Sequence, residues 1–289
     1  DHIGSSDTAA IMGYGHPRHT IHDVYLEKVL DQIDQRQTTE AMEIGNYAES
    51  PLIDWCCKKI DATALRNQRR VAKCKILASN VDALLLDRNE GIEAKSTSRP
   101  DEYGAEMSDE VPVPVMLQCN HHMYCAGLDV VWVPLLTVEY GFLSFRLFRV
   151  PRSDTIIESI VETDHRFWHD HVLPKVPPDD FMPSMETLRR IRREPNKTVE
   201  IPEDLARAYE INRLDCKAAD ETFDMTRRAI LAAMGDAEAG VVSGLGMFTF
   251  FEQRSPPKYD RTAMVADGVF EQYATIGSHR VLRWKAEKE

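Results

Sequence analysis

The chain has 289 residues, of which 43% are hydrophobic and 28% are charged, and this is the composition of a globular protein long enough to bury a sizeable core. Its formal net charge of −12 argues against a protein that coats nucleic acid in general, but not against an enzyme that holds DNA in one local groove. No run of about 18 apolar residues occurs, so the sequence predicts no membrane span.

The first predicted elements are helices. A glycine-serine loop leads into a short helix that Ser5, Ser6 or Asp7 would cap. Apolar residues at helical spacing predict a second helix over 20–31 and a longer amphipathic one over 39–60. Pro51 lies inside the longer run, where it either bends the helix or starts another one.

A mixed series of strands and helices follows. Strand-like runs occupy 71–78, 80–86 and 91–96, and the segment DRNEG forms the turn between the last two. We then expect a helix that ends near Gly127, apolar strands over 129–138 and 142–150, and a helix over 153–173. The predicted fold class is therefore α/β, with a mixed central sheet of about five strands flanked by helices.

The segment LPKVPPDDFMP contains four prolines and marks the best domain boundary. We therefore expect a core over residues 1–181 and a C-terminal extension over 182–289. The extension should contain one long helix over 203–234 and strands over 246–252 and 279–285. It contains no catalytic constellation, so packing on the core is the default role, with a subunit interface or the DNA path as alternatives.

Two acids and a lysine stand out in the predicted hairpin of 80–86 and 91–96. Because side chains alternate along a strand, Glu93 and Lys95 would face the same side, and Asp82 could lie across from Glu93. Two buried carboxylates repel each other unless something neutralises them, and a hard divalent cation with oxygen ligands does so. The competing interpretation is a surface hairpin with an exposed Glu–Lys pair that contributes little to stability.

This pattern resembles the signature of the PD-(D/E)XK nucleases, an acid followed by Glu-x-Lys on a hairpin. Three further segments are similar to the YqaJ-type phage recombinases, relatives of phage lambda exonuclease. IGSSDTAAIMG looks like their opening segment, MEIGNYAES like their helix with Gly-x3-Glu, and VPVMLQCNHHMYCAG like their glutamine-bearing helix. The four motifs appear in family order over residues 3–127, and the resemblance implies a restriction-endonuclease-like core.

The resemblance also implies roles for individual residues. Asp82, Glu93 and the main-chain carbonyl of Ala94 would bind the metal ions, with Glu49 beside the second one. Lys95 would activate the attacking water, and Gln118 would hold the lysine or the scissile phosphate. Ser5 and Ser6 would bind the 5′-phosphate of DNA. Two positions depart from the family pattern, because Val115 replaces a frequent tyrosine and Asn120 a frequent glutamine.

The implied activity is a Mg²⁺-dependent exonuclease that acts 5′-to-3′ on double-stranded DNA ends, with two ions per site that Mn²⁺ could replace. It would produce 3′ single strands for a strand-annealing partner in phage-type recombination. By analogy alone, the chain would form a homo-oligomer, a trimeric ring, in the cytoplasm of a bacterial host. The alternatives are an endonuclease of the same fold and a DNA-end-binding protein without catalysis.

Several other signals are weaker. His165, His169 and His171 lie close together but have no suitable further zinc ligand nearby. His121 and His122 follow Gln118, and either could approach the site or pack in the core. The six cysteines are predicted to be mostly buried and reduced, and their spacing predicts no iron–sulfur cluster. Two basic clusters could be solvated helix faces, and their members are Arg66, Arg69, Arg70, Lys73 and Lys75, then Arg189, Arg190, Arg192, Arg193 and Lys197.

Overall fold

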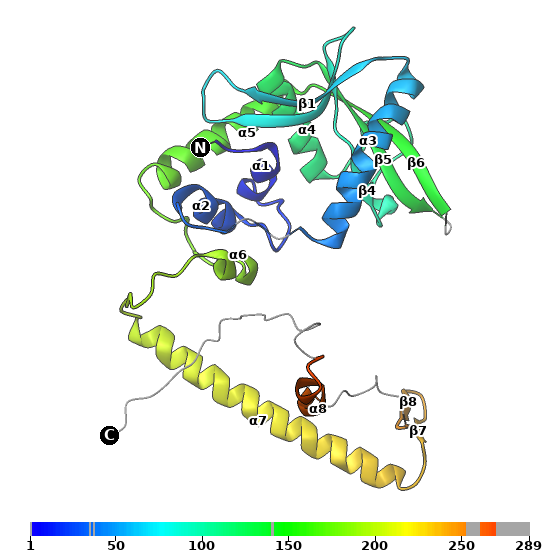
Figure 1. Ribbon diagram of the computed structural model, residues 1–289, viewed down its shortest axis with the longest axis vertical. Coiled ribbons are helices and arrows are strands. Elements are labelled where there is room, and N and C mark those ends of the chain that lie inside the picture. The colour runs from blue at the N-terminus through cyan, green and yellow to red at the C-terminus, as the bar shows by residue number, and fades with distance from the viewer. Residues whose placement is uncertain (1, 35, 37, 140–141, 253–260, 270–289) are drawn as a thin grey trace. The chain divides into compact units, whose positions relative to one another are not determined.

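The computed structural model describes residues 2–34, 36, 38–139, 142–252 and 261–269 (Figure 1). The chain divides into two compact units, Asp1–Arg193 and Glu194–Glu289. The domain boundary that the sequence predicts between residues 181 and 182 stays a prediction. In the structure, the first unit also contains the short helix α6, Met185–Arg190. Among the described residues, no helix is both long enough and apolar enough to cross a membrane.

A mixed sheet organises the first unit. Its strands are β1 (Ala64–Val71), β2 (Ala78–Leu85), β3 (Glu90–Ile92), β4 (Lys95–Thr97), β5 (Val130–Glu139) and β6 (Phe142–Pro151). β1, β2 and β3 are antiparallel neighbours, and β5 and β6 form an antiparallel hairpin. β3 and β4 both pair in parallel with β5. The predicted mixed α/β class is confirmed, as is the hairpin between the second and third predicted strands.

β3 and β4 are consecutive segments that lie along the same side of β5 and are separated only by Glu93 and Ala94. Ile92 pairs with Trp132 and Lys95 with Leu135, so the register along β5 is unchanged across the gap. The gap therefore lies opposite Pro134, which has no N–H to donate to its neighbour. The six strands consequently make a sheet that is five strands wide. The interruption falls at Glu93 and Ala94, the centre of the sequence signature.

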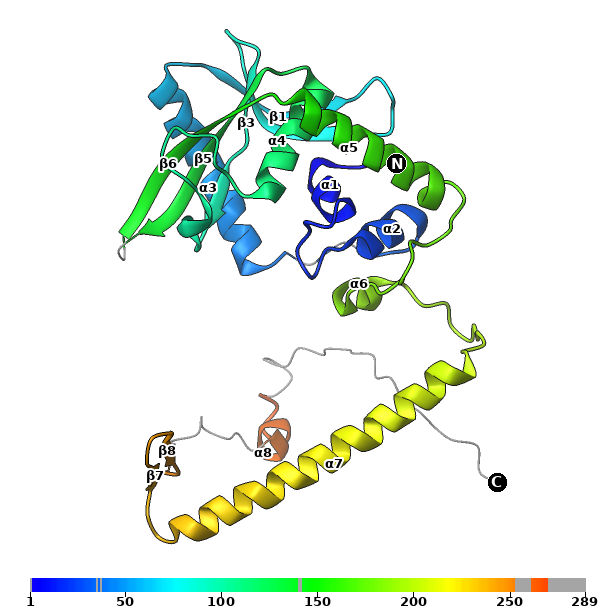
Figure 2. The ribbon, with the colours of Figure 1, turned by 180° about the vertical axis from the view of Figure 1, so that it is seen from behind.

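Helices cover both faces of the sheet (Figures 1 and 2). The first unit contains α1 (Ser5–Ile11), α2 (Ile21–Val29), α3 (Glu40–Ile60), η1 (Pro100–Glu102), α4 (Val113–Ala126), α5 (Asp154–Phe167) and η2 (Trp168–Val172), in addition to α6. Successive β5 residues point to opposite faces. Val131, Val133 and Leu135 pack with α4, whereas Val130 and Trp132 pack with α3. The sheet is thus sandwiched between α3 and α4.

Three expectations for the first unit need correction. The first strand lies at Ala64–Val71 instead of 71–78, and Arg66, Arg69 and Arg70 belong to this strand and not to a helix. β1 pairs only with β2 among the described strands, so it is an edge strand on which charged side chains are common. α3 continues through Pro51 as one helix. Gly4 is the N-cap of α1, since the Asp7 carboxylate accepts a hydrogen bond from the Gly4 N–H at 3.0 Å.

The second unit is dominated by α7 (Glu203–Met234), which confirms the predicted long helix. β7 (Ala239–Val242) and β8 (Gly246–Thr249) form a hairpin, and α8 (Arg261–Ala266) follows. β8 confirms a strand in the run predicted over 246–252. The strand predicted over 279–285 lies outside the described residues.

Candidate active site

The four side chains of the sequence signature come from three consecutive strands and one helix. Asp82 lies on β2, Glu93 directly follows β3, and Lys95 begins β4. The β2–β3 register pairs Ala83 with Ile92, so the next pair along the hairpin is Asp82 and Glu93. Gln118 reaches the same place from α4.

Lys95, Glu93 and Gln118 form a closed triangle of hydrogen bonds. The Lys95 Nζ donates to Glu93 Oε1 at 2.7 Å and to Gln118 Oε1 at 2.8 Å. Gln118 Nε2 donates to the same Glu93 oxygen at 2.7 Å. Each of the three side chains therefore fixes the other two, and the ammonium keeps one of its three protons free to point elsewhere.

The charge of Glu93 is strongly stabilised. Burial would raise its pKa, but Lys95 and His122 outweigh this and lower the pKa to about 2. His122 Nε2 lies 3.0 Å from Glu93 Oε2, and the His122 Nδ1 is hydrogen-bonded to the Ser79 hydroxyl. His122 is completely buried, and it is the histidine of the NHH motif that approaches the site. Glu93 is thus an ionised carboxylate that Lys95, Gln118 and His122 hold in place.

Asp82 has the opposite electrostatic situation. Burial and the charge of Glu93 raise its pKa to about 8, and the charge of Glu49 on α3 adds to the effect. The Ala94 N–H donates a hydrogen bond to Asp82 Oδ2 at 2.8 Å. In the protein alone, Asp82 therefore favours its protonated form near neutral pH, and a bound cation would be needed to compensate its charge.

This donor set fits a divalent cation. Asp82 and Glu93 supply carboxylate oxygens, which hard cations such as Mg²⁺ prefer. In an extended segment the N–H and C=O of one residue point to the same side, so the Ala94 carbonyl should face Asp82 as its N–H does. Among the described residues, no group of three or more histidines, cysteines, aspartates or glutamates is arranged to hold a metal ion, so Glu49 is near Asp82 without completing such a group.

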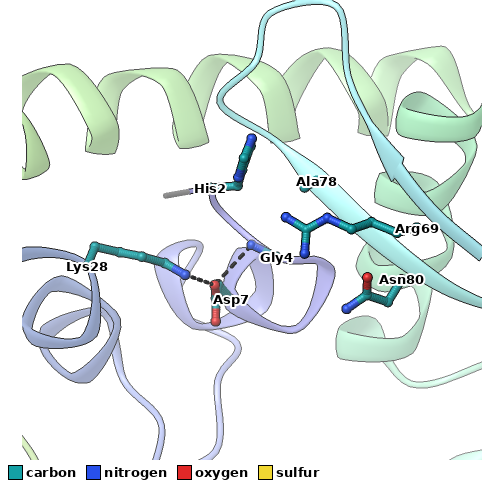
Figure 3. A pocket seen from close by; sticks show the side chains of 7 residues that line it. All are labelled: His2, Gly4, Asp7, Lys28, Arg69, Ala78 and Asn80. Carbon is teal, nitrogen blue, oxygen red and sulfur yellow. Dashed lines mark hydrogen bonds and ion pairs between the residues drawn. The ribbon is translucent and has the colours of Figure 1, made fainter. Parts of the chain in front are cut away.

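A second feature lies next to Asp82. A cavity of about 400 Å³ is lined by His2, Gly4, Asp7, Lys28, Arg69, Ala78 and Asn80. Figure 3 shows Lys28 and Arg69 approaching the start of α1 from opposite sides. Lys28 Nζ is bound to Asp7 at 2.7 Å. Asn80, which lines the cavity, and Asp82 point to the same face of β2, two residues apart along the strand.

Ser5 and Ser6 lie in the first turn of α1, between two residues that line this cavity. Ser5 is buried and Ser6 is exposed. Neither serine lines the cavity itself, whereas Gly4 and Asp7 do. The structure therefore brings Asp82, Glu93, Lys95 and Gln118 together and keeps the two serines apart from them, beside the neighbouring cavity.

The two departures from the family pattern have structural roles. Val115 packs in the core between α4 and the sheet. Asn120 is completely buried, and its side-chain carbonyl accepts the Ser153 N–H at 3.0 Å. Ser153 caps α5, so Asn120 joins two helices where a glutamine at this position would face other partners.

A buried polar chain connects α1, α4 and α5, and the sequence did not reveal it. Thr8 Oγ1 lies 2.7 Å from Asp164 Oδ2 and 2.8 Å from His121 Nδ1, while His121 Nε2 lies 3.2 Å from the Ala78 carbonyl. Thr8, His121 and Asp164 are all completely buried. Burial raises the pKa of Asp164 to about 7 and lowers that of His121 to about 3, so near neutral pH His121 is neutral and Asp164 is about half protonated. The adjacent histidines His121 and His122 stand out in the sequence, but nothing there indicates which of them approaches the active site and which joins the buried chain.

The first part of the chain is similar to known proteins. Residues 1–129 match the model of the YqaJ-like viral recombinase domain. The uncharacterized protein YqaJ of Bacillus subtilis (strain 168) is 24% identical over 177 residues, which are 59% of this chain and 53% of that protein. The chain thus spans about half the length of this curated relative.

Two solved structures are similar at low sequence identity. LHK-Exo, an alkaline exonuclease from Laribacter hongkongensis that was also solved in complex with dAMP, is 14% identical with a TM-score of 0.49. This match covers 61% of the chain and 89% of LHK-Exo. A phage related exonuclease from Haemophilus somnus 129PT is 11% identical with a TM-score of 0.46, over 61% of this chain and 96% of that one.

Proposed function

Because residues 1–129 match the model of the YqaJ-like viral recombinase domain, we propose that the chain is a metal-dependent DNA nuclease that shortens double-stranded DNA from its ends. One observation carries the proposal above all. A lysine ammonium, an ionised glutamate and a raised-pKa aspartate meet at the interrupted strand, and a protein without chemistry there gains nothing from two paired buried carboxylates.

We assign the metal site to Asp82, Glu93 and the Ala94 carbonyl, with Glu49 nearby, and Mg²⁺ as the natural ion. When bound, two such ions would supply a polarised water and stabilise the leaving oxygen of the phosphodiester. The low pKa of Glu93 supports its role as a ligand, since it is ionised without the metal. The raised pKa of Asp82 supports its role too, since a cation would relieve the cost of its charge.

Lys95 is the proposed catalytic residue of the protein itself. Lys95 donates hydrogen bonds to Glu93 and Gln118, so the direction of its third N–H is set before substrate arrives. The ammonium would orient the attacking water or neutralise charge that develops on the phosphate. Gln118 would act as a positioning residue, because it contacts both the lysine and the glutamate.

We place the 5′-phosphate of the DNA end at the start of α1, near Ser5 and Ser6. Lys28 and Arg69 line the neighbouring cavity and give it a basic character that suits an anionic end. Asn80 in the lining of the cavity lies two residues from Asp82 on β2. The products would be 3′ single strands, which a single-strand annealing partner could use. A trimeric ring and a cytoplasmic location in a bacterial host remain further parts of this proposal.

The test uses linear duplex DNA labelled at the 5′ or the 3′ end, beside a closed circle, with Mg²⁺. We expect early release of the 5′ label from linear DNA and an intact circle. Cutting of the closed circle would favour the endonuclease of the same fold, and binding to ends without any release would favour the non-catalytic alternative. Ser6→Ala should reduce the preference for 5′-phosphorylated over 5′-hydroxyl ends.

A further inference from the structure

α7 is a long helix of the second unit. Its 32 residues include none that is buried, although several are large and apolar. A helix of this length extends over roughly 48 Å. Helices in proteins gain most of their stability from packing one face against something else. A helix of this length therefore needs a packing partner.

One face of α7 carries a heptad repeat. Alternating steps of four and three residues connect Leu205, Tyr209, Asn212, Cys216, Ala219, Phe223, Thr226, Ile230 and Ala233. The nine positions span four heptads and include the large apolar side chains of Leu205, Phe223 and Ile230, although Asn212 and Thr226 are polar. Apolar residues at this spacing form the seam along which two helices wind around each other. Leu205, Tyr209 and Phe223 are exposed, and Phe223 keeps 68% of its surface accessible, whereas Ile230 is half-buried.

The two rows of this face differ in size. The row of Tyr209, Cys216, Phe223 and Ile230 is mostly large, whereas the row of Asn212, Ala219, Thr226 and Ala233 is small or polar. A parallel pair of helices would stack each row against its own copy, so that Phe223 meets Phe223 and Ala219 meets Ala219. An antiparallel pair stacks the large row against the small row, which fills space evenly.

In one antiparallel register the layers match from end to end. Leu205 faces the partner's Ile230, and Tyr209 faces the partner's Thr226. Asn212 faces the partner's Phe223, and Cys216 faces the partner's Ala219. Each layer recurs by symmetry at the other end, as an isologous twofold interface requires.

The charged residues beside the heptad face also favour the antiparallel orientation. Arg213 and Asp220 lie on one side of the heptad face, and in the antiparallel register Arg213 of each copy lies beside the partner's Asp220. In a parallel pair, Asp215 would instead lie beside the partner's Asp220, which is a repulsive contact. Within the part of the chain that the structure describes, no ion pair is formed by Arg213 or Asp220, so both charges are available.

We propose that α7 is a self-association element that pairs with α7 of a second copy as an antiparallel two-stranded coiled coil. The element lies outside the nuclease unit and is separate from the proposed catalytic function. The pairing is twofold, so it would join two copies, or two larger assemblies if the nuclease units associate as well.

The first test changes one residue on the heptad face and one on the opposite face. Phe223→Arg places a charge in the interface, whereas Met225→Arg places the same charge on another exposed side of the helix. Light scattering of the full chain should give half the wild-type mass for Phe223→Arg and the wild-type mass for Met225→Arg, with helix content checked by circular dichroism. A monomeric wild type, or equal effects of the two changes, would overturn the proposal.

The second test reads the direction of pairing and survives even if Phe223→Arg fails to fold. In a Cys216→Ser background, Leu205→Cys together with Ile230→Cys should form a disulfide-linked dimer on oxidation, with peptide mapping that joins position 205 to 230. Leu205→Cys alone should remain uncrosslinked, because opposite ends of α7 hold the two copies of residue 205 far apart. A 205–205 bridge would show parallel pairing and contradict the proposal.

The third test exchanges the flanking charges. Arg213→Asp brings four acids together at the two symmetric contacts, and we expect dimerisation to weaken by about tenfold. Adding Asp220→Arg to this variant restores opposite charges at both contacts and should restore association. A double variant no better than the single one would remove the charge argument for the antiparallel register.

Discussion

At the scale of single residues, Asp82 is the group whose charge is most costly. Its pKa is raised to about 8 because it is buried beside Glu93. A carboxyl whose folded pKa lies above its unfolded value stabilises the protein fully below about pH 4, and this stabilisation is lost as the pH rises through 8. The site therefore sacrifices stability in the absence of a cation.

Asp82→Asn should consequently stabilise the metal-free protein at pH 9, by about 2 kcal/mol. Added Mg²⁺ should raise the melting temperature of the wild type and leave that of Asp82→Asn nearly unchanged, because ligands stabilise the state that binds them. Thermal unfolding with and without Mg²⁺ measures both. An equal shift in the two proteins would mean that the ion binds elsewhere.

Asp164 allows a separate prediction about pH. Its folded pKa of about 7 lies above the ordinary value of 3.8, so its contribution to stability falls as the pH rises from 4 through 7. Asp164→Asn keeps the shape and cannot ionise. The free energy of unfolding of the wild type minus that of the variant should therefore decrease over this range. A difference that stays flat with pH would show that Asp164 is ionised in the folded protein throughout.

His122 should matter through Glu93 and not through contact with DNA, because it is completely buried. His122→Leu removes the group beside Glu93 Oε2 and should lower the cleavage rate by about tenfold. His122→Gln retains an N–H donor and should recover most of the rate. Similar losses in both variants would point to packing as the role of the ring.

At the scale of secondary-structure elements, the sequence predicted the hairpin and the α4 helix well. Alternation along β2 and β3 places Asp82, Glu93 and Lys95 on one side from local rules alone. β1 was misplaced because its alternating charged residues look like a polar helix face until the sheet edge is known. The Thr8–His121–Asp164 chain was out of reach, since its members are 113 and 156 residues apart and meet only through tertiary packing.

Pro134 links the sheet to the site at this scale. Pro134→Val supplies an N–H opposite the gap between β3 and β4 and should let the two segments join as one strand. We expect the new amide at position 134 to be protected from hydrogen exchange. Rapid exchange there would show that another feature keeps the gap open.

At the scale of the whole molecule, the residues proposed for catalysis and the helix proposed for self-association belong to different units. The first unit, Asp1–Arg193, contains every residue proposed for chemistry, and the second contains α7. The net charge of −12 does not exclude local binding of an anion, because Arg69 lines the cavity beside α1, where Lys28 is paired with Asp7. The seven-residue spacing of α7 can be read from the sequence, whereas only the structure shows that none of the residues of this helix is buried by the described part of the chain.

The central claim is that Lys95 and its two carboxylates form a nuclease site. The most direct measurement compares wild type, Lys95→Ala and the exposed control Lys73→Ala on linear duplex DNA with Mg²⁺. Lys95→Ala should lose at least about a hundredfold in cleavage rate while it still binds DNA, and Lys73→Ala should behave as wild type. A Lys95→Ala protein that degrades DNA at the wild-type rate would contradict the assignment.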